Sequence, residues 1–514
     1  QGFRFRGRAP AGPFLVLSLP LQQMSSGEAS AEQAWGSIDA VLNAPLKNVS
    51  PDSSYLSILL MWLTLPFSLI QGIFGGLCGC VYRTWSVSGC CTIYASVVKG
   101  RPLYMAWLWW RYMIAALVAL VRHGQSRFAL FQWEKEACGG GEYFWQGEGV
   151  WVTSYALNSE IMQSQQDRSE AFACIRACVP DLFASGLLIF LPTGGPESEW
   201  AAVRAALHGS LLLDREGQTY QDRLGEMLLL LQESWPSPKF ADLNNKALLQ
   251  RSVCRCVFFM LFGRWLSDSD ADILTGWRTL ASTFVLPRLA QRFLFNLGIR
   301  KVKALRRSTV EIVEKSGLKD VFVAMNAGLP SQYRRSSAVK LCDEIMYVIG
   351  FAGIGGTSAC VESVSQFLQM KTGEVPKDTV DFAKYPTTSD MIAAYKADPA
   401  AYVKEVCRLD PPVTSATSTL KEDLEVEMAG RRLALSKGHL RQYTLSLANR
   451  DPAVFENPTL FDPARTSSAR SLTWNGEFDK GEQAYPRLCP GRYLSLQVAQ
   501  AIVDHVVMSL QSGV

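Results

Sequence analysis

The stretch YPRLCPGRYLSLQVAQAIVDHVV, residues 485–507, places a cysteine directly before a predicted helix. Apolar residues recur at helical spacing over 494–507, after Cys489 and the proline and glycine that follow it. Backbone N–H groups and the helix dipole favour a thiolate at such a position. Gly491 has no side chain and would let the chain pass close to a flat ligand, and Arg487 could pair with a carboxylate. Because this motif is a weak signal on its own, a buried structural cysteine is the default interpretation until other residues are considered.

Two segments upstream of the cysteine carry charged residues in a second pattern. EVCRLDPPV, residues 405–413, places Glu405 and Arg408 three apart on one face of a helix that ends before its two prolines. ANRDPAVFENPTLFDPAR then ends in Arg465. A single ion pair is usually a solvated surface bridge, whereas one buried glutamate with two arginines can lock a helix to the loop behind a cofactor. The order and separations of these residues favour the locked network.

These motifs resemble the C-terminal signatures of the cytochromes P450: ExxR at 405–408, FDPAR at 461–465 and RLCPG at 487–491. The resemblance covers most of residues 99–514. It implies a mainly α fold with small β-sheets, in which heme b lies between a long distal helix and the proximal loop that carries Cys489. Ligation of the iron by the Cys489 thiolate would push electron density onto the metal and promote O–O cleavage.

The resemblance also implies roles for other residues. Trp200 and Arg204, in EWAAVRAALHG, match the WxxxR helix of the family, whose members hydrogen-bond heme propionates. Arg487 would hold a propionate as well, and Gly491 would lie beside the macrocycle. The residues implied as structural are Glu405, Arg408 and Arg465, and those implied to line the distal, catalytic side are Phe351, Ala352, Gly353, Gly356 and Thr357.

A long helix is predicted over about 338–371, roughly 50 Å at 1.5 Å per residue. Its middle, GFAGIGGTSAC at 350–360, contains four glycines, each costing on the order of 1 kcal/mol against alanine. They indicate either close approach of the backbone to heme and substrate, with a local distortion, or close packing against another helix. Elsewhere the pattern is mostly helical, with strand-like runs at 127–133 and 149–154.

Oxygen-activating members of the family usually carry AGx(D/E)T in this helix, where the acid and the alcohol help to deliver protons to bound dioxygen. Here Ala352 and Gly353 fit, but Gly355 and Gly356 stand where the acid and the threonine belong. Thr357 comes one residue late, a rotation of about 100° on an ideal helix. A local bulge would restore it, which keeps monooxygenation open, but without one the proton relay is impaired.

The cysteine loop also departs from the usual FxxGxRxCxG pattern, because Glu482 and Tyr485 stand at its Phe and first Gly positions. Instead, WNGEFDKGEQAYPRLCPG resembles a subgroup of the family that contains allene oxide synthases and hydroperoxide lyases. Members of this subgroup rearrange fatty-acid hydroperoxides and carry an SNG-like element the same distance before the cysteine. Asn475 and Gly476 match that element.

The distal helix supports the same subgroup except at one position. FAGIGG, residues 351–356, agrees with the FNxxGG-like element of the subgroup at Phe351, Gly355 and Gly356, but Ala352 replaces the Asn. Because that Asn steers the cleaved peroxide in the subgroup, its loss puts the isomerase or lyase outcome in doubt. A substrate that brings its own O–O bond needs neither reductase electrons nor the proton relay, and we therefore prefer peroxide chemistry.

Three functions follow. The preferred one is a membrane-associated enzyme that cleaves the O–O bond of a lipid hydroperoxide and isomerises, dehydrates or fragments the product. The second is a monooxygenase that inserts one atom of dioxygen into a lipid-like substrate with electrons from an NADPH-dependent reductase. The third, suggested only by the degenerate distal helix, is a non-catalytic heme-binding membrane protein. Dependence on NADPH and a reductase separates the second from the first.

Bulk composition excludes other classes of protein. The 514 residues carry a net charge of only +4, so nothing indicates nucleic acid. The 13 cysteines form no CxxC pair and there are only four histidines, which argues against a disulfide framework or a zinc site. Most of these thiols are expected to be buried small hydrophobes in a reducing compartment.

The N-terminal part contains a candidate membrane segment. Residues 53–82 lack any charged residue and exceed the roughly 20 residues needed to span a bilayer. Basic residues follow, which would keep the rest on the cytoplasmic or equivalent side of an endoplasmic reticulum or plastid membrane. The alternative is a buried core hairpin, while residues 102–121 favour an interfacial helix. The chain is thus divided into a targeting remnant or disordered tail (1–52), a membrane-associated segment (53–98) and a heme-thiolate catalytic domain (99–514).

Overall fold

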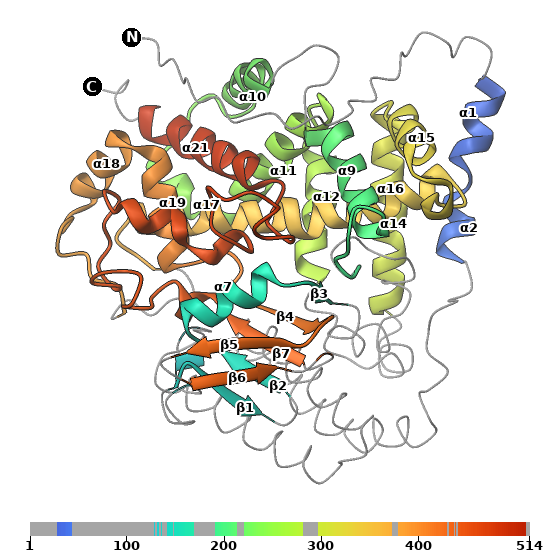
Figure 1. The fold of residues 1–514 in the computed structure, drawn as a ribbon. Coiled ribbons are helices and arrows are strands. Elements are labelled where there is room, and N and C mark those ends of the chain that lie inside the picture. Colours follow the sequence, from blue (N-terminus) through green and yellow to red (C-terminus); the bar gives the residue numbers. More distant parts are fainter. Residues whose placement is uncertain are drawn as a thin grey trace.

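Helices and two small sheets make up the part of the chain that the computed structural model describes (Figure 1). This part comprises residues 28–43, 128, 131–132, 135, 141–146, 149–168, 191–212, 220–280, 297–372, 379–428, 431–435, 437 and 440–509. The apolar segments predicted to meet a membrane, at 53–98 and 102–121, lie outside these residues.

Most of the described residues are helical, as the sequence predicts. In chain order the helices are α1 (Glu28–Trp35), α2 (Ile38–Leu42), α7 (Tyr155–Gln163), α9 (Glu199–Leu207), α10 (Tyr220–Ser234), α11 (Lys246–Phe262), α12 (Asp268–Leu280), α14 (Leu297–Lys315), α15 (Lys319–Gly328), α16 (Ala338–Val348), α17 (Gly355–Leu368), α18 (Thr388–Ala397), α19 (Pro399–Leu409), α20 (Leu445–Ala448) and α21 (Arg492–Ser509).

The larger sheet joins strands that are far apart in the sequence. Its strand order is β1 (Tyr143–Gln146), β2 (Gly149–Val152), β7 (Leu440–Thr444), β4 (Ser415–Leu420) and β3 (Gln166–Asp167). β2 and β7 run parallel, and the other neighbours are antiparallel. A separate antiparallel pair consists of β5 (Leu424–Met428) and β6 (Arg431–Leu435). The strand predicted at 149–154 is therefore confirmed over its first four residues.

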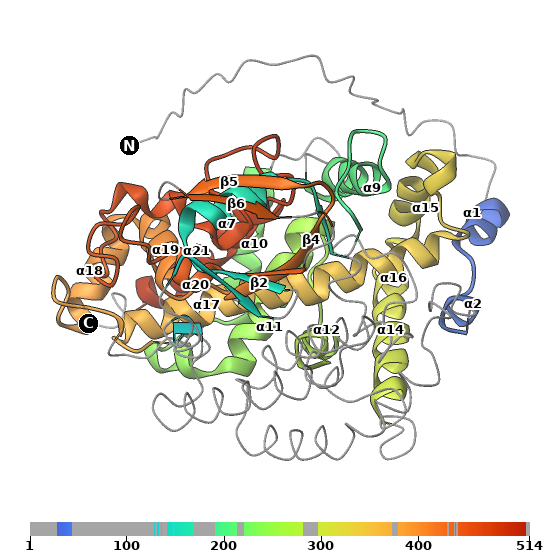
Figure 2. The ribbon, with the colours of Figure 1, turned by 60° about the horizontal axis from the view of Figure 1, so that its bottom comes forward.

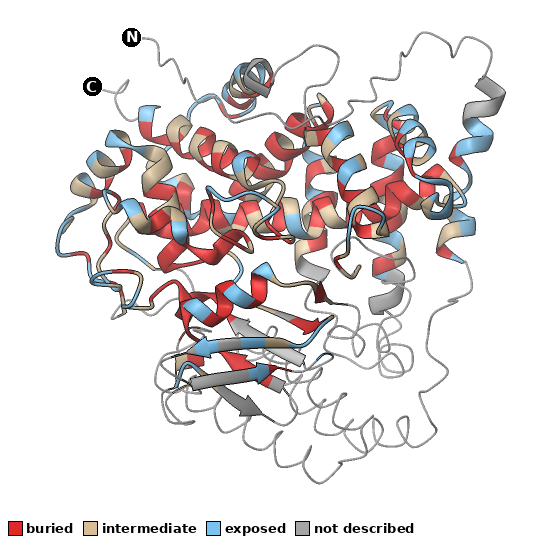
Figure 3. Cartoon of the chain, in the orientation of Figure 1, coloured by how far each residue is buried: buried red, intermediate tan, exposed pale blue. Residues whose placement is uncertain are grey.

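The long helix predicted from the glycine-rich segment is the central element of the fold. It runs without a break from Ala338 through a π-helical turn, Ile349–Ile354, to Leu368, and it crosses the molecule in both ribbon views (Figures 1 and 2). We call α16, this turn and α17 the distal helix. It packs against α11, α12, α19 and α21 and is mostly buried (Figure 3). The local distortion predicted for its middle is the π turn.

Among the described residues, the distal helix also has the length and composition of a membrane span. However, 67% of its most apolar stretch is buried inside the protein. Burial on several sides explains why the helix is apolar around much of its circumference. Its composition is therefore that of a core helix.

One strand prediction is wrong. In the stretch 127–133 the described residues are helical rather than extended. Phe128 and Phe131 are three apart, which places both on one helix face, and both are buried. The Arg450 guanidinium lies over the Phe128 ring at 4.3 Å, and the Trp151 ring centroid is 5.9 Å from that of Phe131. Tertiary packing of the two rings thus overrides the strand propensity of the aromatic residues.

Part of the predicted N-terminal tail is folded. Residues 28–42, within the segment expected to be a targeting remnant or disordered, form α1 and α2. Trp35 at the end of α1 is 2% exposed, its indole N–H donates to Glu314 Oε1 at 2.7 Å, and its ring centroid is 6.5 Å from that of Phe322. One buried tryptophan contributes a large apolar area. The expectation of disorder is therefore corrected for these residues.

Candidate functional site

Sequence signals fix both ends of α19. The Asp398 carboxylate accepts a hydrogen bond from the Ala401 N–H at 2.9 Å, and a proline opens the first turn. The helix ends at Leu409, before the two prolines, as predicted. These ends place Glu405 and Arg408 on the buried face of α19.

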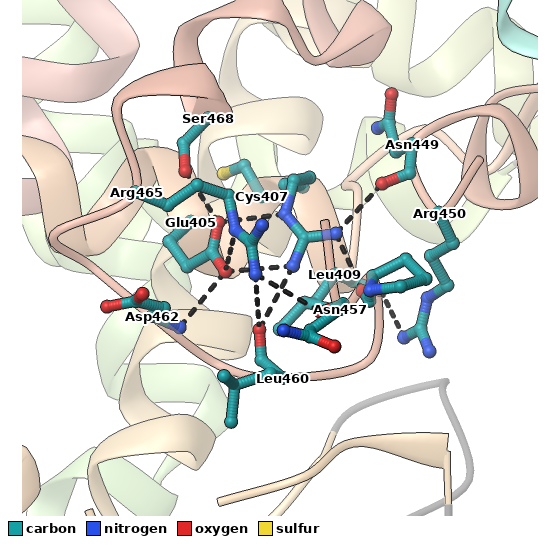
Figure 4. A network of polar contacts seen from close by, with 12 residues as sticks. Glu405, Cys407, Leu409, Asn449, Arg450, Asn457, Leu460, Asp462, Arg465 and Ser468 are labelled. Carbon is teal, nitrogen blue, oxygen red and sulfur yellow. Dashed lines mark hydrogen bonds and ion pairs between the residues drawn. The ribbon is translucent and has the colours of Figure 1, made fainter. Parts of the chain in front are cut away.

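A buried carboxylate then links α19 to the loop after α20, residues 449–468 (Figure 4). Glu405 and Arg408 are both fully buried, and Arg408 donates through Nε and Nη2 to both carboxylate oxygens of Glu405 at 2.8 Å. The Ser468 hydroxyl and the Asp462 N–H donate to the same carboxylate at 2.6 and 3.1 Å, and Arg465 Nε donates at 3.4 Å. The structure thus brings together the three residues predicted to form this network.

The two arginines of the network also bind the backbone of the loop. Arg408 Nη1 donates to the carbonyl oxygens of Asn449 and Pro458, at 2.9 and 2.8 Å. Arg465 Nη2 donates to that of Asn457 at 3.1 Å. Because both cations and the carboxylate have close partners, their desolvation is offset, and the loop is held against α19.

Cys489 lies in a loop just before α21, which begins at Arg492. Its N–H donates to the Trp474 carbonyl at 2.8 Å, and its side chain is only partly buried. The surrounding protein raises the pKa of the thiol, while the Gly491 N–H and two nearby guanidinium groups lower it. A metal ion bound to this sulfur would remove the proton outright.

Two residues that distinguish this cysteine loop from the usual pattern, Gly476 and Tyr485, pack against each other. Asn475 has a left-handed backbone with φ +60°, and Gly476 follows at φ +152°, where a side chain is strained. A Cβ on Gly476 would lie 2.5 Å from Cγ of Tyr485, so the tyrosine ring packs directly on the Gly476 backbone. The Tyr485 and Ser159 hydroxyls are hydrogen-bonded at 2.8 Å. Gly476 therefore provides the room that Tyr485 needs, and Tyr485 ties the cysteine loop to α7.

The two residues of the WxxxR motif lie together on α9. Both are buried, and the Arg204 guanidinium lies over the Trp200 ring at 5.0 Å. Arg204 pairs with Glu482 at 2.7 Å and donates to the carbonyl oxygen of Leu488, the residue before the cysteine. The motif therefore contacts the cysteine loop at two points.

Arg487 is a third buried group in the same region. It is 7% exposed and donates through Nη2 to the Leu191 carbonyl. Arg204 thus contacts the cysteine loop from α9, whereas Arg487 extends from the loop itself. Of the two arginines predicted to hold propionates, Arg204 thus contacts the residue before Cys489, and Arg487 lies two positions before it.

The middle of the distal helix is its least covered part. Ala352 is exposed, and Phe351, Gly353 and Gly356 are partly exposed, although most of the helix is buried. A Cβ added to Gly356 would meet nothing within 4 Å, and the same holds for Gly491 next to the cysteine. Open space therefore borders both the distal helix and the cysteine loop.

The glycines of the distal helix divide between the two predicted alternatives. A Cβ on Gly350 would lie 2.5 Å from the Trp277 ring on α12, so this glycine serves helix packing. A Cβ on Gly353 would touch only Ile349, at 4.0 Å, and Gly356 has open space beside it. These two glycines are therefore the ones placed for approach of a ligand.

Thr357 belongs to the buried face of the helix. It is 4% exposed, and its hydroxyl donates to Ser495 Oγ on α21 at 3.2 Å. Thr357 is therefore buried, unlike the uncovered residues 351–353 with which it was grouped by sequence.

Known proteins match the chain mainly through its fold. No protein-family model matches it. Over 91 residues it is 35% identical to a putative cytochrome P450 140 of Mycobacterium bovis, and over 119 residues it is 29% identical to a divinyl ether synthase of Selaginella moellendorffii. These matches cover 17% and 22% of the chain and only 20% and 25% of the two relatives.

Solved structures extend the likeness over most of the chain. The econazole-bound CYP164A2 of Mycobacterium smegmatis is 17% identical with a TM-score of 0.51, covering 79% of this chain and 93% of that one. Epothilone D-bound cytochrome P450epoK is 18% identical with a TM-score of 0.50, covering 72% and 86%. The chain has the cytochrome P450 fold.

The residues of this P450 fold fit the heme that the fold implies. Cys489 offers a partly exposed sulfur next to a helix start, and Gly491 borders open space where a flat macrocycle needs it. On the distal helix, Gly356 also borders open space. Cys489 would therefore bind the iron, and the resemblance implies that Trp200, Arg204 and Arg487 would hold the propionates.

Sequence reasoning missed the partners of two predicted site residues, Arg204 and Thr357. Glu482 was recognised only as a departure from the usual loop, and its pairing with Arg204 spans 278 positions of sequence. The hydrogen bond between Thr357 and Ser495 spans 138 positions. Neither contact has a signal in local spacing, because each depends on how two helices and the cysteine loop pack.

Proposed function

We propose that the protein is a cytochrome P450 enzyme that rearranges a fatty-acid hydroperoxide, in the manner of allene oxide synthases and hydroperoxide lyases. The observation that carries the proposal is the make-up of the uncovered stretch of the distal helix. It presents Phe351, Ala352 and Gly353 and neither an acid nor an alcohol, because the Thr357 hydroxyl donates to Ser495. When bound, thiolate-ligated heme iron supplies cleavage of an O–O bond. The partial match to a divinyl ether synthase supports the same choice.

The uncovered residues are suited to binding an apolar chain. The Phe351 ring stacks on Tyr347, with centroids 5.6 Å apart and an interplanar angle of 7°, so it is held against the helix. Ala352 and Gly353 add apolar surface with little bulk. Since a hydroperoxide brings its own O–O bond, this face has only to orient the substrate and exclude water; it has no proton to deliver to dioxygen.

One observation favours a second function, monooxygenation. The π-helical turn Ile349–Ile354 adds a residue to the helix just before Thr357, which is the kind of local bulge that shifts the helical register. In this alternative, the enzyme inserts one atom of dioxygen into a lipid-like substrate and takes electrons from an NADPH-dependent reductase.

We further propose that the protein associates with an endoplasmic reticulum or plastid membrane, with its catalytic part on the cytoplasmic or equivalent side. The support is the uncharged segment 53–82 and the basic residues after it. A lipid-derived substrate would reach the enzyme from the same membrane.

The proposed reaction predicts that purified, heme-loaded full chain consumes a polyunsaturated fatty-acid hydroperoxide without NADPH or reductase. Product analysis then identifies isomerisation, dehydration or fragmentation. The proposal is overturned if hydroperoxide is not consumed in a sample whose reduced carbon monoxide complex has the absorption band of thiolate-ligated heme. Oxygen insertion that requires NADPH and reductase would then support the monooxygenase, and inactivity with both oxidants the non-catalytic alternative.

The exposed alanine of the distal helix gives a second prediction. Ala352→Asn restores the amide that the hydroperoxide subgroup carries at this position, and we expect it to change the ratio of rearranged products by about tenfold, equivalent to one hydrogen bond to a reacting group. The measurement is product composition by chromatography. Ala393→Asn, at an exposed position of α18, is the matched control for an asparagine in a helix and should leave the products unchanged. Equal product ratios in both variants would show that residue 352 does not contact the reacting group.

A further inference from the structure

The Arg204 guanidinium makes its polar contacts with two groups of the protein itself, the Glu482 carboxylate and the Leu488 carbonyl. Its guanidinium meets the Glu482 carboxylate through Nε at 2.9 Å and Nη2 at 2.7 Å, and Nη2 also donates to the Leu488 carbonyl. The Trp200 ring supports the guanidinium from the side at 5.0 Å. The arginine side chain is 8% exposed, so these contacts account for much of its surroundings.

These contacts lie at the two ends of the segment that leads to the ligand cysteine. Glu482 is seven residues before Cys489, and Leu488 is directly before it. Beyond the segment, the Cys489 N–H is held by the Trp474 carbonyl at 2.8 Å. Arg204 therefore closes the loop 482–488 from one side, while residue 474 fixes its end.

Glu482 is a negatively charged partner for Arg204 that keeps its charge across the physiological pH range. Burial raises the pKa of its carboxyl, but hydrogen bonds from His208 and Arg204 outweigh this effect and lower the pKa to about 2. His208 Nε2 lies 3.0 Å from Glu482 Oε1. The carboxylate is thus ionised across the physiological range, and it stands at a position where the usual P450 loop has a phenylalanine.

We propose that Arg204 is a positioning residue that braces the cysteine loop through Glu482 and Leu488, with Glu482 taking the counterion role that the family resemblance assigns to a heme propionate. Trp200 then serves to orient Arg204 toward the loop. Of the two arginines predicted to hold propionates, Arg487 is left for that role. This inference rests on the proposed heme-thiolate function.

The two roles of Arg204 predict opposite results when the charge of Glu482 is removed. If Arg204 chiefly binds a propionate, Glu482 competes for it, and Glu482→Gln should hold heme as tightly as the wild type or more tightly. If Arg204 braces the loop, the same substitution loosens the segment before Cys489, and the thiolate ligation becomes less stable.

The experiment compares heme-loaded full chain with Glu482→Gln, Glu482→Asp, Arg204→Ala and the Arg204→Ala/Glu482→Gln double variant. The readouts are the decay of the thiolate-type band of the reduced carbon monoxide complex and the rate of heme transfer to excess apomyoglobin. We expect Glu482→Gln to accelerate both by about tenfold, the effect of losing one charge-assisted hydrogen bond. Glu482→Asp should recover most of the wild-type behaviour.

The double variant and a matched control complete the test. Because Arg204 and Glu482 act as a pair, the double variant should be no worse than Arg204→Ala alone. Glu226→Gln, an exposed glutamate on α10, should behave as wild type. Unchanged or slower heme loss in Glu482→Gln, or additive effects in the double variant, would overturn the bracing role. A wild-type protein that never shows the thiolate-type band would instead overturn the heme-thiolate assignment on which the inference rests.

Discussion

Cys489→Ala is expected to lose the thiolate-type band of the reduced carbon monoxide complex and to consume fatty-acid hydroperoxide no faster than free heme does. Cys489 is the one cysteine among the described residues that is not fully buried, and it lies beside Gly491, next to open space. Removal of the sulfur takes away the proposed iron ligand, and thiolate ligation is what promotes O–O cleavage. The measurements are the absorption spectrum and the rate of hydroperoxide loss.

Cys254→Ala is the matched control for this prediction. Cys254 is fully buried on α11, where burial raises the pKa of its thiol, so it behaves as a small apolar residue. We expect this variant to keep the spectrum and the activity, with at most a small loss of stability. A thiolate-type spectrum that persists in Cys489→Ala would transfer the ligand assignment to another cysteine.

Glu405→Ala is expected to lower the free energy of unfolding by about 3–5 kcal/mol, because it leaves the buried Arg408 and the nearby Arg465 without their shared carboxylate. This is a large share of the stability of an ordinary domain, so a reduced yield of soluble heme-loaded protein should accompany it. Urea denaturation, followed by tryptophan fluorescence and heme absorbance, measures the change. Glu405→Gln keeps the shape of the side chain and one hydrogen-bond acceptor, so it should lower the free energy of unfolding by less.

An exposed ion pair provides the comparison for Glu405. Arg251 donates to both carboxylate oxygens of Asp272 at 2.8 and 2.7 Å, but the Asp272 side chain is 49% exposed. Solvent screens such pairs, so Asp272→Ala should lower the free energy of unfolding by less than about 1 kcal/mol. Equal effects of Glu405→Ala and Asp272→Ala would show that burial of the Glu405 network does not amplify its contribution.

Local sequence was sufficient where each signal lies within a few residues of its consequence. Pro399 and the two prolines after Leu409 define the ends of α19, and the three-residue spacing of Glu405 and Arg408 places both on its buried face. The apolar periodicity after Cys489 predicted α21, and the long apolar run predicted the distal helix. For the same reason, the position of the cysteine directly before a helix was predictable from sequence alone.

Sequence reasoning was insufficient where burial depends on distant partners. The tail containing Trp35 reads as polar, and contacts with distant residues of α14 and α15, those of Trp35 among them, hold residues 28–42 against the core. The helical state of Phe128 likewise depends on Arg450, more than 300 positions away. Sequence spacing grouped Thr357 with Ala352, whereas packing against α21 placed its hydroxyl on the buried side of the helix. In each case the local structure depends on contacts between residues that are far apart in the sequence.

The packing of Tyr485 on Gly476 has a consequence for how loops of this type are recognised and altered. Where the usual pattern has a glycine, this chain has Tyr485, and the glycine on which that ring packs stands nine residues earlier. Neither position can change independently: a side chain at 476 collides with the tyrosine, and a glycine at 485 leaves a void and removes the hydrogen bond to Ser159 on α7. A search pattern that demands glycine at the later position will pass over such chains, whereas one that scores the two positions jointly will retain them. Transplanting the loop into another protein with the cytochrome P450 fold would require moving both residues together.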